Sequence, residues 1–174
     1  MHCLRQQKSR DDLDSFSLAD FVDTNDDFIG AFAVTAGHGI DKYIEDFEKD
    51  LDDYNSIILI ALADRFAESF AEFAHHKVRT EFWGYAAKES LDNEAYIKEE
   101  YQGIRPAPGY PSCPDHRLKN DIWDLLDVEQ KINISLTDSL AMWPTASVSG
   151  LYFSHPQSRY FQLGRIDKDL SLIH

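Results

Sequence analysis

Hydrophobic positions recur at helical spacing over two stretches in the first half of the chain. Between residues 40 and 54, apolar side chains return every three or four positions with acidic residues between them, which predicts a helix. The same spacing predicts a longer helix over residues 56–79, in which alanines between the large side chains permit close packing. Its predicted apolar face consists of Leu59, Leu62, Phe66, Phe70 and Phe73. A third, short helix is predicted over residues 93–101.

Shorter apolar segments bounded by turn residues predict strands. Residues 18–22 and 28–36 are two such segments, on either side of a turn rich in Asp and Asn. Residues 148–153 and 159–166 flank a connection of five residues, which predicts a β-hairpin. Asp115 is the predicted N-cap of a helix that follows it directly. Together these elements predict a single α+β domain with a mainly antiparallel sheet.

Composition narrows the classes of protein to which the chain can belong. We expect one domain over residues 1–174, with fraying within the polar residues 1–16. The 31 acidic residues outnumber the 17 Lys and Arg, and the resulting net charge of −14 would repel a nucleic-acid backbone. No apolar run reaches the roughly 18 residues that span a bilayer. Two cysteines and no apolar leader predict a cytoplasmic protein, with no nucleic-acid or membrane partner.

Residues 103–116 form the most unusual segment, because four prolines and two glycines surround one arginine and one tyrosine. Proline fixes φ and removes a backbone donor, so the segment can be neither a helix nor an inner strand. A stiff loop loses little conformational entropy when it binds a ligand. With the guanidinium of Arg105 and the ring of Tyr110, the loop suits a small zwitterionic ligand, although a purely structural connector has the same composition.

The sequence of this loop, GIRPAPGYPSCPDH, resembles the signature of the activation domain of cobalamin-dependent methionine synthase, the module that binds S-adenosylmethionine. The resemblance runs from about residue 4 to residue 167 and implies a twisted antiparallel sheet flanked by helices. Further blocks that carry it are SLADFV (17–22), IGAFAVTAG (29–37), ALADRFAESFAEF (61–73), WGYA (83–86), SLAMWPTASVSG (139–150) and YFSHPQSRYF (152–161). Compared with that family the chain begins late and ends early, so we expect a fragment or a reduced stand-alone subunit.

The resemblance assigns ligand contacts to the proline-rich loop. Arg105 can form a bidentate contact with a carboxylate, and the resemblance implies that it contacts S-adenosylmethionine. Ala107 and Gly109 have side chains too small to keep a ligand from the backbone, and the family uses the main chain of this loop for binding. Tyr110 is expected either to stack on the adenine or to cover the core.

Four further residues are assigned to the site by the resemblance. Tyr160 and Phe161 match an aromatic pair that contacts the ligand, and on a strand only one of two adjacent side chains would point at it. Glu68 and Glu99 match acidic residues near the ligand, where a carboxylate would stabilise an ammonium or sulfonium. For both glutamates a solvated helix charge or an internal partner of Arg105 is the alternative.

The sequence indicates no catalytic residue and no bound metal. Cys113 and His116 have the spacing C-x-x-H, but even with His75 and His76 they lack a second pair at zinc-ligand spacing. The chain also has no glycine-rich dinucleotide motif and no cobalamin-binding motif.

The function implied by the resemblance is reductive reactivation of cob(II)alamin. Cobalamin would be held by a separate cobalamin-binding module, and the electron would come from a flavodoxin-like donor. Displacement of a methyl group from a sulfonium needs orientation rather than proton transfer, which agrees with the absence of acid–base residues. The alternatives are a non-catalytic docking module for a cobalamin-binding domain or a flavodoxin-like reductase, and a structural or metal-binding domain.

Overall fold

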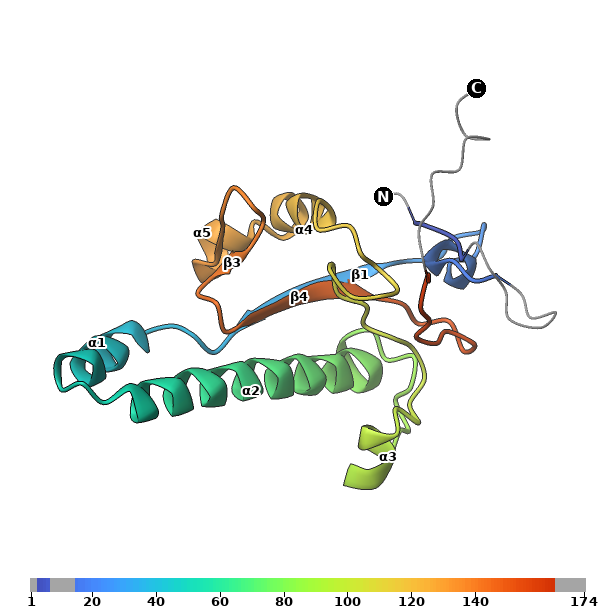
Figure 1. The fold of residues 1–174 in the computed structure, drawn as a ribbon. Coiled ribbons are helices and arrows are strands. Elements are labelled where there is room, and N and C mark those ends of the chain that lie inside the picture. Colours follow the sequence, from blue (N-terminus) through green and yellow to red (C-terminus); the bar gives the residue numbers. More distant parts are fainter. Residues whose placement is uncertain (1–2, 7–14, 165–174) are drawn as a thin grey trace.

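A two-stranded antiparallel ladder lies at the centre of the computed structural model, which describes residues 3–6 and 15–164 (Figure 1). Strand β1 (Gly30–Thr35) pairs with β4 (Ser147–Tyr152) in a register that runs from Gly30 opposite Tyr152 to Thr35 opposite Ser147. Helix α2 covers one face of the ladder, and α4 and α5 lie on the other side. This arrangement confirms the predicted α+β fold and the predicted strand within residues 28–36.

Helix α2 (Asp53–Lys77) follows α1 (Asp41–Lys49) and packs against it and against both strands. Asp52 caps α2 by accepting a hydrogen bond from the amide of Asn55 at 3.1 Å. The residues that α2 buries are small, apart from its last buried residue: Ser56, Ala63, Ala67, Ala71 and His75. Two helices are therefore confirmed where the helical spacing predicted them, and alanine lets the longer one approach the sheet closely.

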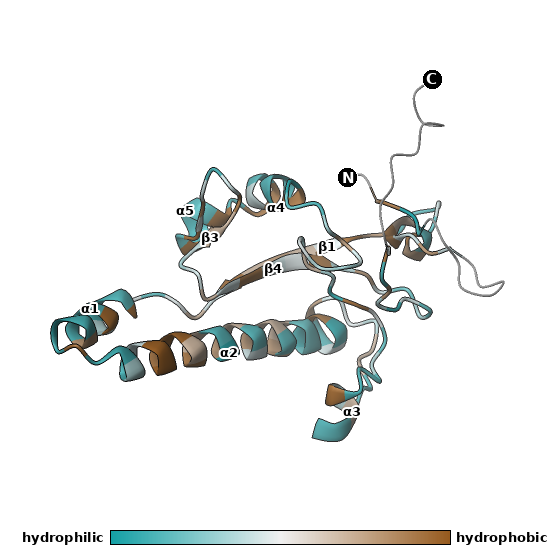
Figure 2. Ribbon diagram, in the orientation of Figure 1, coloured by the Kyte–Doolittle hydropathy of each residue, from teal (hydrophilic) through white to brown (hydrophobic). Residues whose placement is uncertain are grey.

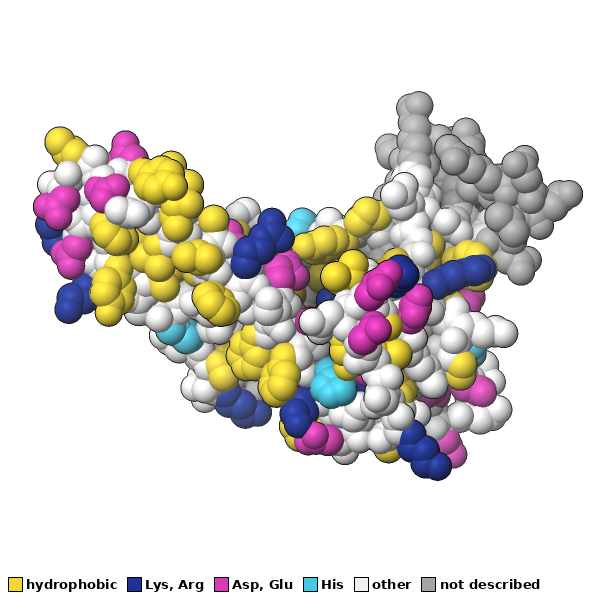
Figure 3. Space-filling view, turned by 90° about the horizontal axis from the view of Figure 1, so that it is seen from below, with side chains coloured by type: hydrophobic (Ala, Val, Ile, Leu, Met, Phe, Trp, Pro, Cys, Tyr) yellow, Lys and Arg dark blue, Asp and Glu magenta, His cyan; other side chains and the backbone are white. Residues whose placement is uncertain are grey.

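The large apolar side chains that form the predicted apolar face of α2 lie on its outer surface and not against the sheet. Phe66 is 66% exposed and Phe73 is 55% exposed. Figure 2 shows the apolar colour concentrated in the N-terminal half of α2, and Figure 3 shows hydrophobic side chains gathered on the surface over α1 and α2. The alanines are buried instead, because their positions repeat at the same helical spacing and only a face of small side chains fits against the sheet.

The segment after α2 continues as a π-helix (η2, Val78–Phe82) that buries Arg79 completely. The short helix α3 (Asn93–Ile97) follows, capped by Asp92, which accepts a hydrogen bond from the amide of Ala95 at 2.9 Å. It ends earlier than predicted, because Glu99 adopts a positive φ of 55°. The chain then enters the proline-rich loop.

The second half of the chain places two short helices and a small hairpin over the ladder. Helix α4 (Leu118–Leu126) is followed by α5 (Val128–Ile132) and by the paired strands β2 (Ser135–Leu136) and β3 (Met142–Trp143). Asp115 is not the N-cap of α4. Its carboxylate instead accepts a hydrogen bond from the amide of Arg117 at 2.9 Å, in the turn that precedes the helix. The main core consists of Leu18, Phe21, Ile104, Cys113, Ile122, Trp123, Val128, Ile134, Leu151 and Phe153.

Two predicted strands are absent from the part of the chain that the structure describes. Residues Leu18–Phe21 form a 3₁₀ helix (η1), because the hydroxyl of Ser17 and the carboxylate of Asp20 cap its amides reciprocally. Residues 159–164 form no strand, and residues 165–166 of the predicted hairpin lie outside the described residues.

The proline-rich loop occupies the edge of β4 that the second hairpin strand would have needed. Ile104 and Phe153 exchange both backbone hydrogen bonds at 3.0 Å, and the amide of Leu151 donates to the carbonyl of Pro106 at 3.0 Å. Proline can accept but cannot donate, so an edge position suits it. The opposite edge of β4 is already paired with β1. No helix among the described residues is long and apolar enough to cross a membrane.

Candidate functional site

A half-open cavity of about 440 Å³ lies where α2, the proline-rich loop and the segment 160–162 meet. Seven of the eight residues that the sequence assigned to a ligand site line it: Glu68, Glu99, Arg105, Ala107, Tyr110, Tyr160 and Phe161. Phe32, Val148 and Gln162 also line it and were not predicted. Segments far apart in the sequence are thus brought to one pocket, whose volume is in the range of small-molecule sites.

The loop reaches this position because glycine allows it to approach β4. A Cβ atom at Gly150 would lie 2.7 Å from the carbonyl oxygen of Pro106 and 2.8 Å from the ring of Phe32. Gly109 has a positive φ of 101°, and a Cβ atom there would collide with the ring of His116. Its amide donates to the carbonyl of Cys113 at 2.8 Å. Gly109 therefore shapes the turn of the loop and does not line the pocket.

Arg105 is held at the pocket by contacts on both its side chain and its backbone. Its Nη2 lies 2.8 Å from Oε2 of Glu72, and its Nη1 donates to the hydroxyl of Tyr101 at 2.8 Å. Among the described residues Glu72, and not Glu68 or Glu99, forms the ion pair with Arg105. The carboxylates of Glu68 and Glu99 are therefore not engaged in an ion pair with Arg105. Glu72 was missed by the sequence analysis, because nothing in its neighbourhood distinguishes it from the other acidic residues of α2.

The aromatic wall of the pocket differs from the one predicted for a strand. Tyr160 and Phe161 both line the cavity, because residues 159–164 are irregular and their side chains need not alternate. The hydroxyl of Tyr160 accepts a hydrogen bond from the amide of Arg105 at 3.0 Å. Desolvation by burial raises the pKa of Tyr160, so the hydroxyl keeps its proton. That proton remains available for donation to a second group.

Behind Arg105 lies a buried group of charged and aromatic side chains. The guanidinium of Arg79 contacts Glu89 through Nε at 2.8 Å and Nη2 at 2.9 Å, and it lies 4.0 Å from the ring centre of Tyr101. The ring of His75 stacks on Tyr152 with a centroid distance of 5.1 Å. The guanidinium groups of Arg79 and Arg105 place two positive charges beside the imidazole of His75. Both groups can donate hydrogen bonds but cannot accept them.

Burial, reinforced by the charges of Arg79 and Arg105, lowers the pKa of His75 to about 2. His75 is therefore neutral at physiological pH. Its Nδ1 lies 3.5 Å from Nη1 of Arg105 and must be an acceptor, which leaves Nε2 with the proton, 3.3 Å from the hydroxyl of Tyr85. Within residues 3–6 and 15–164, no three His, Cys, Asp or Glu side chains gather in a way that could hold a metal ion.

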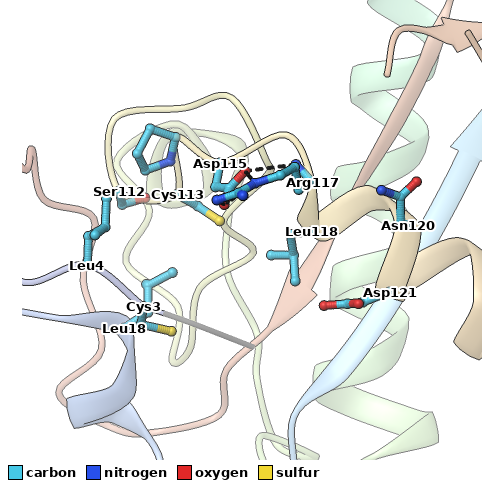
Figure 4. A pocket seen from close by; sticks show the side chains of 11 residues that line it. Cys3, Leu4, Leu18, Ser112, Cys113, Asp115, Arg117, Leu118, Asn120 and Asp121 are labelled. Atoms are coloured by element: carbon cyan, nitrogen blue, oxygen red, sulfur yellow. Dashed lines mark hydrogen bonds and ion pairs between the residues drawn. The ribbon is translucent and has the colours of Figure 1, made fainter. Parts of the chain in front are cut away.

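A second cavity of about 470 Å³ lies on the other side of the loop, between the N-terminal segment and the start of α4 (Figure 4). Cys3, Cys113, Asp115 and Arg117 are among the residues that line it. The charges of Asp115 and Arg117 are paired with each other at 2.8 Å. Since none of the eight predicted site residues lines this cavity, the pocket at Arg105 is the stronger candidate for a ligand site.

The fold and the pocket together define a class: an α+β domain in which a rigid proline-rich loop, two glutamates and aromatic rings enclose a small-molecule-sized cavity. The chain belongs to the family described as "Vitamin B12 dependent methionine synthase, activation domain", whose model matches residues 1–171. This membership confirms the resemblance drawn from the sequence.

A crystal structure of the MetH reactivation domain bound to AdoHcy is similar to this chain, with 54% sequence identity and a TM-score of 0.90. The match covers 95% of this chain and 52% of the other. The chain thus spans about half the length of that relative.

Proposed function

We propose that this chain binds S-adenosylmethionine in the pocket at Arg105 and presents its methyl group for the reductive reactivation of cob(II)alamin in methionine synthase. The observation that carries the proposal is the convergence of Arg105, Glu68 and Glu99 on one cavity in a chain of the activation-domain family. The related domain of known structure is described as bound to AdoHcy, which is S-adenosylmethionine without its transferable methyl group.

The charges around the pocket match those of this ligand. S-adenosylmethionine carries a carboxylate, an ammonium and a sulfonium. Arg105 can receive the carboxylate, while Glu68 and Glu99 can stabilise the two cationic groups. Tyr110 and Phe161 offer rings against which an adenine can pack.

The contribution of the chain to the reaction is orientation. Cobalamin, carried by a separate module, supplies the cobalt nucleophile that receives the methyl group. The residues of this chain fix the sulfonium end of the ligand and leave one side of the pocket open to that partner. Displacement from a sulfonium needs no general acid or base. We accordingly assign no catalytic residue to the chain itself.

The partners follow from this function: a cobalamin-binding module of methionine synthase, and a flavodoxin-like protein that supplies the electron. Methyl transfer to homocysteine and the use of a folate donor belong to other modules of the enzyme. We place the reaction in the cytoplasm, where such an electron donor operates.

Calorimetric titration of the purified chain with S-adenosylmethionine tests the proposal. We expect saturable binding at one site, and we expect Arg105→Ala to weaken it by about 2 kcal/mol, or roughly 30-fold. Arg117→Ala is the matched control, because Arg117 is exposed and paired with Asp115 outside this pocket. Equal affinity for the parent and Arg105→Ala would remove Arg105 from the site.

A further inference from the structure

We infer that Glu72 is a positioning residue that sets the guanidinium of Arg105 for the carboxylate of the ligand, and that buried Arg79 anchors it. The inference rests on the proposed function, in which Arg105 receives that carboxylate. Glu72 does not line the pocket and would not touch the ligand itself.

Glu72 occupies the point on α2 where the pocket meets the buried group behind it. It lies one helical turn after Glu68, which lines the pocket, and seven residues before Arg79. Side chains at such spacings share one face of a helix. Its Oε2 pairs with Nη2 of Arg105 at 2.8 Å, and its Oε1 lies 3.9 Å from Nη1 of Arg79. One carboxylate therefore stands between two guanidinium groups.

Arg79 is a rigid anchor for this carboxylate. Its side chain is completely buried, and Glu89 clamps it through two hydrogen bonds of 2.8 and 2.9 Å. It lies in the π-helix that follows α2, a rare geometry that occurs frequently at functional sites. Tyr101 gives a second connection, because its ring covers Arg79 while its hydroxyl accepts from Arg105. The position of Arg105 is thus coupled to Arg79 along two routes.

The charge of Glu72 is needed, and not only its shape. Oε1 of Glu72 and Nη1 of Arg79 are both buried, and neither has a hydrogen-bond partner among the described residues. Their interaction at 3.9 Å is therefore electrostatic, and an amide in place of the carboxylate would not supply it. Without the negative charge the two guanidinium groups would repel each other, and Arg105 would turn toward solvent.

A guanidinium that is already fixed loses less entropy when it binds a carboxylate. Nη2 of Arg105 uses one donor on Glu72, and Nη1 directs its two donors to the hydroxyl of Tyr101 and to Nδ1 of His75. The guanidinium has five donors in all, so the others remain for the ligand. Glu72 should therefore affect only those ligands that present a carboxylate to Arg105.

The test compares S-adenosylmethionine with its decarboxylated analogue, which keeps the adenosine, the sulfonium and the amine. For the parent and for Glu72→Gln, calorimetry gives the ratio of the two affinities. We expect the parent to prefer S-adenosylmethionine and Glu72→Gln to reduce that preference by at least about fivefold. Glu81→Gln is the control, because Glu81 pairs with Lys77 at the end of the helix, outside the pocket. It should leave the ratio unchanged.

The outcomes separate a positioning role from its alternatives. A general structural role for Glu72 would weaken both ligands equally and leave the ratio unchanged, which would overturn the inference. A rise in the ratio would also overturn it, because Glu72 would then merely compete with the ligand for Arg105. In the Arg105→Ala background, Glu72→Gln should have no further effect on the ratio.

Two further results complete the test. Where Glu72→Gln fails to fold, Glu72→Asp keeps the charge but shortens the reach, and it should lower the ratio in the same direction. If the parent bound neither ligand, the proposed function would fail, and the inference with it. Binding by the parent with an unchanged ratio in the variants would overturn the inference alone.

Discussion

Arg79→Met removes the most deeply buried charge in the described part of the chain and should destabilise the fold strongly. The side chain of Arg79 is fully buried, and that of its partner Glu89 is only 5% exposed. The substitution deletes hydrogen bonds of 2.8 and 2.9 Å to a carboxylate that stays inside the protein. Removing one partner of a buried ion pair costs about 3–5 kcal/mol, so we expect the free energy of unfolding to fall by that amount.

The loss should depend on pH in a definite direction. Burial by itself would raise the pKa of Glu89, and the hydrogen bonds from Arg79 and His76 offset this and lower it. A lowered pKa contributes stability that is present above the pKa of the unfolded chain and is lost as the pH falls. Without Arg79 the pKa of Glu89 should rise, so that Glu89 takes up a proton on folding in mild acid. The destabilisation by Arg79→Met should therefore shrink as the pH is lowered.

Urea denaturation measures the coupling free energy between Arg79 and Glu89. It compares the parent, Arg79→Met, Glu89→Met and the double variant Arg79→Met/Glu89→Met. We expect the double variant to recover much of the loss, because it leaves no unpaired charge inside. Lys98→Met is the control, since Lys98 pairs with Glu94 at 2.7 Å on the surface and should contribute little. A loss below about 1 kcal/mol for Arg79→Met, or simple additivity in the double variant, would refute this reasoning.

Three further predictions concern the loop and the buried histidine. Tyr160→Phe removes the acceptor of the Arg105 amide and should weaken S-adenosylmethionine binding several-fold in calorimetry, whereas unchanged affinity would show that only the ring matters. Gly150→Ala places a Cβ atom 2.7 Å from the carbonyl oxygen of Pro106 and should cost about 1–3 kcal/mol in urea denaturation; a neutral result would mean that the loop yields freely. Because burial lowers the pKa of His75 to about 2, its stabilising contribution is complete above the unfolded pKa of about 6.5 and is lost as the pH falls. Between pH 7.5 and pH 5.5, the free energy of unfolding of the parent should therefore fall by about 1.4 kcal/mol more than that of His75→Phe. Equal changes in the two proteins would contradict a neutral buried imidazole.

Helical spacing identified α1 and α2 correctly but could not identify the buried face of α2. The phenylalanines and the alanines of that helix both recur every three or four residues. Hydrophobicity alone favours burial of the larger residues, as at Phe66 and Phe70. The close approach of the helix to β1 and β4 selects the alanines instead, and that approach depends on contacts between distant parts of the chain.

The strand pairing was unpredictable for a related reason. The segment 148–153 has a sequence neighbour that could form a hairpin with it, but β1, more than a hundred residues earlier, takes one edge. The proline-rich loop takes the other edge through Ile104 and Pro106. The local sequence pattern predicts where a strand lies in the chain. Which segments pair with its two edges depends on contacts between distant parts of the chain.

Much of the candidate pocket followed from the family resemblance, which assigned Arg105, Glu68 and Glu99 to the ligand; their residue types alone did not distinguish them from surface charges. Glu72 and His75 could not be identified in this way. Glu72 is one of many acidic residues in a chain with 31 of them, and only the fold places it against Arg105. The sequence indicates only a weak metal ligand at His75, whereas the structure buries it beside Tyr152 and Arg105.

A crystal structure of this chain grown with AdoHcy is the most direct test of the central claim. We expect the ligand in the cavity lined by Glu68, Glu99 and Arg105, with its carboxylate at the guanidinium of Arg105 and its adenine beside the rings of Tyr110 or Phe161. Density for AdoHcy elsewhere, such as in the cavity at Cys113 and Arg117, or an empty Arg105 pocket at millimolar ligand, would contradict it.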